Sequence, residues 1–315
     1  MKLNKVKYFT NNDWIDKDKS TRMDLFKELI YVFIRPLLSR YSSRYLTMAT
    51  LRKHKPYFVL PGRGIPYRTR RHWVSRLCHI KDATILVQGV GYGWEVLSWA
   101  KMRPKKIIGV DLFSFSETWD EISQYCQEKY NIEVEFQQAS LESLSFLENC
   151  SINICVSDAV YEHCRDLNSV LKESFRVLKP GGVLYAAYGP LWFSAGGDHF
   201  SVRAGLQNSF NHLILNQKEY MKFVNYCSCK DEEYQGGRRY IEIDLFSKLT
   251  TQEYLELLKI NGFKIDKMVI ETNSRALAFK KQYPEKFSEI VEICYGKCDA
   301  DDLIIQSNIV FCIKY

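Results

Sequence analysis

The sequence predicts an α/β fold in which one mainly parallel sheet carries helices on both faces. Between residues 83 and 190, short apolar segments alternate with amphipathic segments of helical spacing. The apolar segments are residues 85–88, 107–111, 134–138, 152–157 and 183–187, and the helical ones include 116–130 and 167–177. Such alternation is typical of βαβ units, which place helices on the two faces of a parallel sheet. We therefore expect a three-layer, doubly wound architecture.

The first of these strands ends in a glycine-rich turn, Gly89-Val-Gly-Tyr-Gly93, and a helix is expected over residues 95–101. Glycines let a backbone approach a ligand closely, and a helix start offers N–H groups, so this turn suits a nucleotide-like ligand. The glycine spacing alone does not separate a binding loop from a tight connection. Asp111 ends the next strand, about 20 residues on, where open α/β sheets present a carboxylate to ribose hydroxyls.

Together with three later segments, this turn resembles the class I (Rossmann-like) S-adenosylmethionine-dependent methyltransferases. Ser157-Asp-Ala-Val-Tyr-Glu-His163 is similar to the family's segment after its fourth strand, and Arg176-Val-Leu-Lys-Pro-Gly-Gly182 to the turn before its fifth. Ala139-Ser-Leu-Glu-Ser-Leu144 lies where the family contacts the adenine. The resemblance implies a methyltransferase (EC 2.1.1.-) that uses S-adenosyl-L-methionine and has an antiparallel C-terminal strand. The cofactor-binding residues that it implies are Gly89, Gly91, Gly93, Glu95, Asp111, Leu112, Ser140, Leu141, Ser157 and Asp158.

The chain departs from the family pattern at two positions. Val87 and Gln88 stand where the family commonly has the acidic residue that helps to hold the cofactor's amino-acid end. Glu95 could compensate, or it could be an exposed residue in the first turn of its helix. Ser140 stands where the family usually has an adenine-side Asp, and a hydroxyl bonds more weakly than a carboxylate.

Residues 1–80 are expected to form an N-terminal helical extension and an arginine-rich loop. Residues 23–35 have helical apolar spacing and are interrupted by Pro36. This helix would cover the core, or alternatively contact a membrane surface as a peripheral amphipathic element. The loop over residues 59–72 contains four arginines, of which Arg63 and Arg68 are the candidate substrate-binding ones. It would bind phosphate or carboxylate groups, or be a solvated basic loop.

The rest of the chain is expected to form three parts. These are a cofactor-binding core over residues 81–200, a substrate lid over 201–245 and the C-terminal part of the core sheet over 246–315. Residues 201–245 break the alternation and are expected to form the substrate wall. In the C-terminal part, Thr250 and Glu253 predict a capped helix, followed by a strand over residues 263–270. Residues 284–300 are expected to be helical, and residues 307–314 to form the final strand.

The loop over residues 188–200 leaves the ligand-binding edge of such a sheet and contains Asp198-His199. His199 is the first candidate for a general base that activates an acceptor hydroxyl, although a structural histidine is an equal alternative. His163, after the fourth strand, competes for this role. Asp198 would hold a sugar hydroxyl, bind a divalent ion or cap a turn. Tyr161 and Trp192 are expected as apolar walls, and no metal site is assigned.

Composition sets few further limits on function. The 315 residues are 46% hydrophobic and 26% charged, with a formal net charge of +7 and no long run of like charges. Nucleic acid is not expected as a partner, because a basic recognition helix and a stacking platform are missing. Ten scattered cysteines are interpreted as reduced thiols of a cytoplasmic protein.

The acceptor is not defined by these patterns. The loop pattern at 189–199, with residues 281–284 and 301–303, is similar to methyltransferases encoded with bacterial surface-polysaccharide pathways. This resemblance implies O-methylation of a sugar or glycan precursor, which could bear a phosphate. Alternatives are a lipid-linked intermediate or another acceptor, and a non-catalytic binding protein with a degenerate cofactor site.

Overall fold

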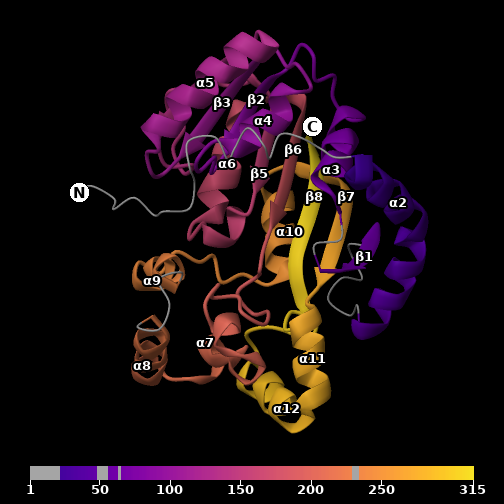
Figure 1. Cartoon of the computed structure of the whole chain (residues 1–315), viewed down its shortest axis with the longest axis vertical. Helices are drawn as coiled ribbons and strands as arrows, with labels where there is room; N and C mark the ends of the chain where they lie inside the picture. Colours follow the sequence, from indigo (N-terminus) through magenta and orange to yellow (C-terminus); the bar gives the residue numbers. More distant parts are fainter. Residues whose placement is uncertain (1–21, 48–55, 63–64, 229–233) are drawn as a thin grey trace.

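The sheet is built as the alternation of segments predicts. In the computed structural model, which describes residues 22–47, 56–62, 65–228 and 234–315, the strands form one eight-stranded sheet in the order β1-β7-β8-β6-β5-β2-β3-β4 (Figure 1). Every neighbouring pair is parallel except those of β8, which runs antiparallel to β6 and β7. The strands are β1 (Phe58–Pro61), β2 (Thr84–Gln88), β3 (Lys106–Asp111), β4 (Glu133–Gln138), β5 (Ile152–Asp158), β6 (Leu178–Tyr188), β7 (Phe263–Thr272) and β8 (Ile305–Lys314). The predicted fold class is confirmed.

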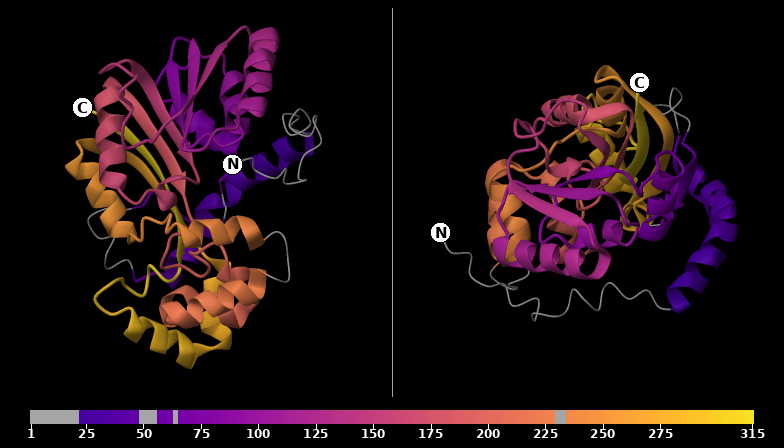
Figure 2. Two further views of the ribbon diagram at one scale, coloured as in Figure 1. Left: turned by 90° about the vertical axis from the view of Figure 1, so that its left-hand side faces the viewer. Right: turned by 90° about the horizontal axis from the view of Figure 1, so that it is seen from above.

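Helices cover both faces of this sheet (Figure 2). Successive strand residues point to opposite faces, so Leu86 joins one apolar cluster, while Ile85 and Val87 join the other. The first cluster is closed by α6 and α10, and the second by α3, α4 and α5. The described helices are α2 (Arg22–Ser42), α3 (Tyr67–Ser75), α4 (Trp94–Ala100), α5 (Ser116–Tyr130), α6 (Leu167–Val177), α7 (Asn211–Ile214), α8 (Gln217–Ser228), α9 (Tyr234–Glu242), α10 (Thr251–Ile260), α11 (Ser274–Gln282) and α12 (Pro284–Ile293).

Local sequence signals account for several of these boundaries. The α10 helix begins with the predicted capping box: the Thr250 side chain accepts from the Glu253 amide, and the Glu253 carboxylate accepts from the Thr250 amide. The α6 helix begins at Leu167 and is capped by Asp166, whose carboxylate accepts from the Ser169 amide. In both cases the side chain satisfies N–H groups that a helix start leaves unbonded.

The prediction of a loop over residues 59–72 is wrong. Residues 58–61 form β1, an edge strand parallel to β7, and α3 begins at Tyr67. A strand of four residues that ends in Pro61 is too short to show an alternating pattern, and its pairing with β7 comes from a segment about 200 residues away. The α3 helix starts directly after Pro66, a residue suited to a helix start.

The expected interruption at Pro36 is also wrong, because α2 continues to Ser42. A proline inside a helix costs about 3 kcal/mol, and packing against β1 and α3 offsets this cost. The Arg35 guanidinium lies over the rings of Phe58 and Trp73, and the Val59 amide donates to Ser39 Oγ. Phe33 and Leu37 remain 73% and 71% exposed, so contact of this helix with a membrane surface stays a prediction.

The segment over residues 201–245 is largely helical. It contains two short 3₁₀ turns, then α7, α8 and α9, and Figure 1 shows these helices together with α11 and α12 at one end of the sheet. The α11 helix was not expected, and α12 ends at Ile293 rather than near residue 300. Cys229 and the charged residues 230–233 lie outside the described residues. None of the described helices meets the length and hydropathy that a membrane span requires.

Candidate functional site

The glycine turn closes against the end of β3. The amides of Gly89 and Val90 both donate to the Val110 carbonyl, at 2.8 and 3.1 Å. Gly89, Gly91 and Gly93 have φ values of 67°, 51° and 94°, which glycine adopts without strain. A Cβ on Gly89 would lie 2.3 Å from the Val160 side chain, whereas a Cβ on Gly91 would meet nothing within 4 Å. The turn is therefore packed on the Gly89 side and open at Gly91, where a ligand can approach the backbone.

Asp111 lies at this turn, as predicted. Its two carboxylate oxygens accept from the amides of Gly91 (2.8 Å) and Phe113 (2.9 Å), so the side chain is held in one position. Each of these oxygens keeps further acceptor capacity for a hydroxyl. Leu112, the next residue, is 48% exposed. The Ala139 amide donates to the Asp111 carbonyl, which brings Ser140 and Leu141 close to the same edge.

The residues expected on the adenine side differ in exposure. Ser140 is half-buried and its hydroxyl accepts from the Glu142 amide at 3.2 Å. Leu141 is 8% exposed and belongs to the cluster covered by α6. Ser157 is buried at the end of β5, and its hydroxyl makes no hydrogen bond to any described residue.

A buried ion cluster occupies the space beside Val87. Val87 pairs with Val156, so Asp158, two residues further on β5, points to the same face of the sheet. The Arg71 Nη2 atom lies 3.0 Å from Asp158 Oδ2 and 3.1 Å from Glu95 Oε1. The Asp158 carboxylate also accepts from Arg70 and Tyr185. Asp158 from a neighbouring strand and Glu95 from α4 thus place two carboxylates near Val87, where the sequence has no acid.

The two carboxylates of this cluster share one guanidinium nitrogen. Burial, and then the nearby charge of Asp158, raise the pKa of Glu95 to about 8, despite the opposing effect of Arg71. The Arg71 guanidinium also lies 4.2 Å from the Trp99 ring centroid. Its Nη1 atom is buried and makes no hydrogen bond within the described chain. A buried N–H of this kind is a donor suited to a ligand carboxylate.

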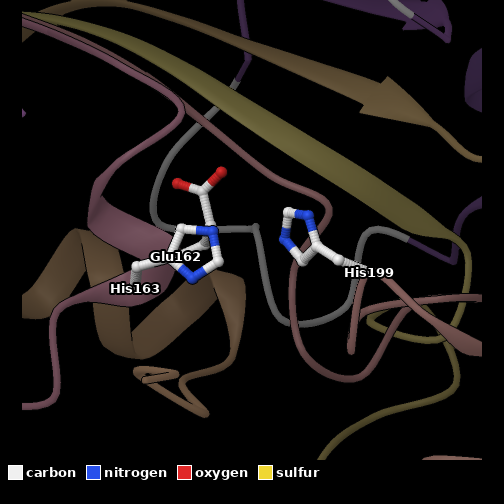
Figure 3. Close-up of side chains that lie close together, drawn as sticks. All are labelled: Glu162, His163 and His199. Atoms are coloured by element: carbon white, nitrogen blue, oxygen red, sulfur yellow. The ribbon is translucent and has the colours of Figure 1, made fainter. Parts of the chain in front are cut away.

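The two histidines considered as alternative bases lie next to each other. The rings of His163 and His199 have centroids 4.7 Å apart, and Figure 3 shows them facing each other with the Glu162 carboxylate beside them. Glu162 and His163 belong to a 3₁₀ turn after β5, and His199 to the loop after β6. Because β5 and β6 are parallel neighbours, their carboxyl ends bring the two segments together.

The environment of His163 favours its neutral form. Its Nδ1 atom lies 2.9 Å from the Leu245 carbonyl oxygen, which fixes the proton on Nδ1 and leaves a lone pair on Nε2. Burial lowers its pKa, and the bond to Leu245 opposes this only in part. The ring stacks on Tyr240 of α9, with centroids 4.6 Å apart, and also contacts Phe246.

Tyr240 connects the histidine pair to the glycine turn. Burial raises its pKa, and the charges of Asp111 and Glu162 add to this effect, so its hydroxyl lies within the field of both carboxylates. The next residue back, Arg239, lies 4.6 Å over the Phe113 ring. The α9 helix therefore covers the carboxyl ends of both β3 and β5. This is consistent with the expected wall over residues 201–245.

Asp198 is not presented to the histidine pair. It is fully buried and accepts hydrogen bonds from the Phe200 amide, the Ser201 amide and hydroxyl, and the Tyr220 hydroxyl. Burial by itself would raise its pKa, but His212, Ser201 and Tyr220 together lower it. These bonds fix the loop that carries His199, whose φ of 57° is unusual for a residue with a side chain. The geometry favours a structural role for Asp198.

The predicted substrate-binding residues are dispersed. Tyr161 is 1% exposed and donates to Gln88 within the core, so it does not line the edge of the sheet. Trp192 is half-buried, with its ring 4.9 Å from that of Phe246, beside the histidine pair. Arg68 is exposed on α3, whereas Arg70 and Arg71 belong to the ion cluster. Arg63 lies outside the described residues.

Sequence reasoning missed Tyr240 and Phe246. Tyr240 belongs to the end of the segment expected as a lid, and Phe246 is the first residue of the part expected after it. The pattern indicates a wall there but not which aromatic side chain faces inward. It also missed Arg71 as a partner of Glu95 and Asp158. Arginines in one turn of a helix give no sign of which of them is buried.

Residues 86–186 match a family model described as "Methyltransferase domain". The chain is 28% identical over 119 residues to ubiquinone biosynthesis O-methyltransferase of Pseudomonas putida, which covers 37% of this chain and 48% of that protein. It is 25% identical over 176 residues to the protein of the same name from Albidiferax ferrireducens, covering 56% and 66%. The chain thus spans about half to two thirds of the curated relatives it matches.

One solved structure is similar to this chain. It is an S-adenosylmethionine-dependent methyltransferase from Mesorhizobium loti, with 13% identity and a TM-score of 0.45 over 77% of this chain and 96% of that one.

Proposed function

We propose that this protein transfers a methyl group from S-adenosylmethionine to a hydroxyl oxygen of a small molecule, a proposal supported by the match of residues 86–186 to a methyltransferase domain model. The choice of a hydroxyl acceptor is supported mainly by the pair of His163 and His199 at the carboxyl edge of the sheet. Ligands of open α/β sheets bind at this edge. The pair lies under α9, which also reaches the end of β3.

The described residues fit the cofactor. Asp111 is held at the turn for ribose hydroxyls, and Gly91 leaves open space beside it. The Arg71 Nη1 atom is a buried donor for the carboxylate of the amino-acid end, and Asp158 and Glu95 are acceptors for its ammonium group. Exposed Leu112 and the nearby Leu141 would contact the adenine. When bound, the cofactor supplies an electrophilic methyl group on a sulfonium.

The chemistry required of the protein is alignment and removal of one proton. The acceptor oxygen attacks the methyl carbon in line with the carbon–sulfur bond, whose electron pair remains on sulfur as that bond breaks. The acceptor proton passes to a neutral histidine. His163 offers a bare Nε2 for this step, because Leu245 holds the proton on Nδ1. Close alignment in a site that excludes water would supply much of the rate enhancement, and base catalysis typically adds about 10²- to 10⁴-fold.

The class of acceptor is the finer part of this proposal. Trp192, Tyr240 and Phe246 form an aromatic wall around the histidines, and such a wall suits the face of a sugar ring or of a phenol. We favour a sugar or glycan precursor, as in polysaccharide biosynthesis, on the loop pattern over residues 189–199. The curated relatives are named for ubiquinone biosynthesis, so a phenolic or lipid-linked acceptor is the alternative. A phosphate on the acceptor would be bound by Arg68, which is exposed on α3.

Methyl-labelled S-adenosylmethionine tests this proposal. The protein is incubated with separate pools of nucleotide sugars, free sugars, catechols and prenylated phenols, and labelled products are identified by mass spectrometry. We expect one hydroxyl-bearing pool to be labelled, with loss of labelling in both His163→Ala and His199→Ala. Labelling of amine or carbon acceptors alone would reject the hydroxyl class. Cofactor binding without transfer to any pool would favour the non-catalytic alternative.

A further inference from the structure

Three side chains with metal-ligating atoms converge at the carboxyl edge of the sheet. Glu162, His163 and His199 each offer one ligand atom, and these atoms all lie within 4.8 Å of one another (Figure 3). A first-row divalent ion bonds such atoms at about 2.0–2.2 Å. Small rotations of the three side chains would therefore bring them onto one ion. Two of the three are adjacent in the sequence, and His199 is added by the loop after β6.

The surroundings of His163 are those of a metal ligand. Its Nδ1–H is directed to the Leu245 carbonyl at 2.9 Å, which leaves Nε2 as the ligand atom. Metal-bound histidines almost always donate their second ring N–H to a carbonyl, carboxylate or water in this way. The ring is held further by Tyr240 and Phe246, so its orientation is set before any ion binds.

The charge of the cluster also fits a cation. Glu162 is 2% exposed, and burial of a carboxylate is costly unless a positive group lies close to it. A divalent ion here would compensate the Glu162 charge.

We propose that Glu162, His163 and His199 form a site for a first-row divalent metal ion. Two imidazoles and one carboxylate on one side of an ion leave coordination positions open, and this donor set favours Zn²⁺, Fe²⁺, Co²⁺ or Mn²⁺ over Mg²⁺ and Ca²⁺. The sequence had suggested a divalent ion at Asp198 as one alternative. The Asp198 carboxylate accepts hydrogen bonds from Ser201 and Tyr220 instead. The metal site proposed here uses His199, the next residue in the chain, and does not include Asp198.

The role of the ion rests on the proposed function, whereas its binding does not. An acceptor hydroxyl in an open position would have its pKa lowered, as for metal-bound water. Its proton would leave to solvent, and the resulting oxygen anion would attack the methyl carbon while the carbon–sulfur electron pair stays on sulfur. In this form of the mechanism the two histidines hold the ion and the ion replaces the general base.

A Co²⁺ titration tests the site without cofactor or acceptor. Protein stripped with a chelator is titrated while the visible absorption of the ion is recorded, and Zn²⁺ is then added as competitor. We expect one equivalent of Co²⁺ to bind and to be displaced by Zn²⁺, and the binding to be lost in Glu162→Gln and His199→Ala. His79→Ala is the matched control, because that side chain is 77% exposed and remote from the cluster.

Two further measurements keep the outcome decisive. Circular dichroism shows whether each variant is folded. Thermal unfolding with and without Zn²⁺ then shows whether the folded variant binds the ion, because a folded Glu162→Gln protein should lose the Zn²⁺-dependent rise in Tm. Cys294→Ser/Cys298→Ser removes a pair of adjacent thiols elsewhere in the chain as competing ligands. The proposal is overturned if Co²⁺ binding survives in the folded Glu162→Gln and His199→Ala variants, or disappears in the double cysteine variant. Absence of Co²⁺ binding, or binding of Mg²⁺ alone, would overturn it as well.

Discussion

The imidazole rings of His163 and His199 lie 4.7 Å apart, although 35 residues of chain and the whole of β6 separate them. The two residues are alternatives when only the sequence is considered, and the fold makes them partners. The two histidines act either as a base or as ligands of one ion. In both cases, removal of either histidine should impair activation of the acceptor hydroxyl. This relationship leads to the first prediction.

His163→Ala and His199→Ala should each lower kcat by about 100-fold or more, the usual range for a lost base. The affinity for S-adenosylhomocysteine should stay within about twofold, because neither ring touches the glycine turn in the described contacts. Steady-state kinetics and calorimetry on the same preparations measure both quantities, with His79→Ala as control. A variant that loses cofactor affinity and turnover together would contradict the separation of the two sites.

Arg71→Lys should weaken binding of S-adenosylhomocysteine by about 10-fold or more, because a charge-assisted bond to the amino-acid end is worth about 1.5–3 kcal/mol. Binding of 5′-methylthioadenosine, which lacks that end, should change little. Arg68→Lys, on the exposed side of α3, serves as the control. Equal loss for both ligands would show that Arg71 acts only by fastening α3 to the sheet.

Gly89→Ala and Gly91→Ala should have different effects. The Cβ at Gly89 would lie 2.3 Å from Val160, so this variant should lose stability and cofactor binding together. At Gly91 there is room, and the fold should lose only about 1 kcal/mol for the left-handed backbone, while cofactor affinity falls steeply. Urea unfolding and calorimetry distinguish the two. Unchanged affinity in a folded Gly91→Ala protein would mean that the ligand does not approach this backbone.

Glu95→Gln should flatten the dependence of stability on pH. The folded protein binds a proton at Glu95 with a pKa of about 8, against an ordinary value of 4.5. The contribution of protonated Glu95 to the free energy of unfolding is therefore fully present below about pH 4.5, and it is lost as the pH rises through about 8. Urea unfolding across the intervening range should show a smaller decline for Glu95→Gln than for the unchanged protein or for the exposed control Glu121→Gln. Parallel curves would exclude a retained proton at Glu95.

Asp198→Asn should destabilise the fold by about 3 kcal/mol, since it breaks a buried, fully bonded carboxylate network. The loss should be accompanied by lower turnover, because the same bonds fix the loop of His199. The exposed Asp82→Asn is the control. If Asp198→Asn abolishes turnover without any change in unfolding free energy, Asp198 acts on the substrate and not on the loop.

The sequence predicts much of the sheet and little of the site that lies over it. β2, β3, β5 and the two helices α5 and α6 have strong local patterns, and their bounds agree with expectation within one or two residues. β1 consists of four residues and exists because β7 is available to pair with it, which no local pattern reports. Pro36 misleads for a similar reason, since packing of Arg35 on Phe58 and Trp73 outweighs the broken helix bond.

At the site, spacing identifies residues at strand ends but not their partners. Asp111 meets the glycine turn because β2 and β3 are parallel neighbours, and this follows from the pattern alone. The sharing of Arg71 by Glu95 and Asp158 depends on how α3 docks, and the contact of Tyr240 with His163 depends on where α9 folds back. These are tertiary arrangements that the periodicity of a single segment does not encode.

Calorimetric titration with S-adenosylhomocysteine tests the central claim most directly. We expect binding at one equivalent to the unchanged protein, and an affinity lower by about 10- to 100-fold in Asp111→Asn, which keeps the shape of the side chain but weakens its bonds to ribose hydroxyls. The contradictory result is an absence of binding at millimolar ligand, or binding that Asp111→Asn leaves unchanged. Either would show that the glycine turn at Gly89 to Gly93 is not a cofactor site.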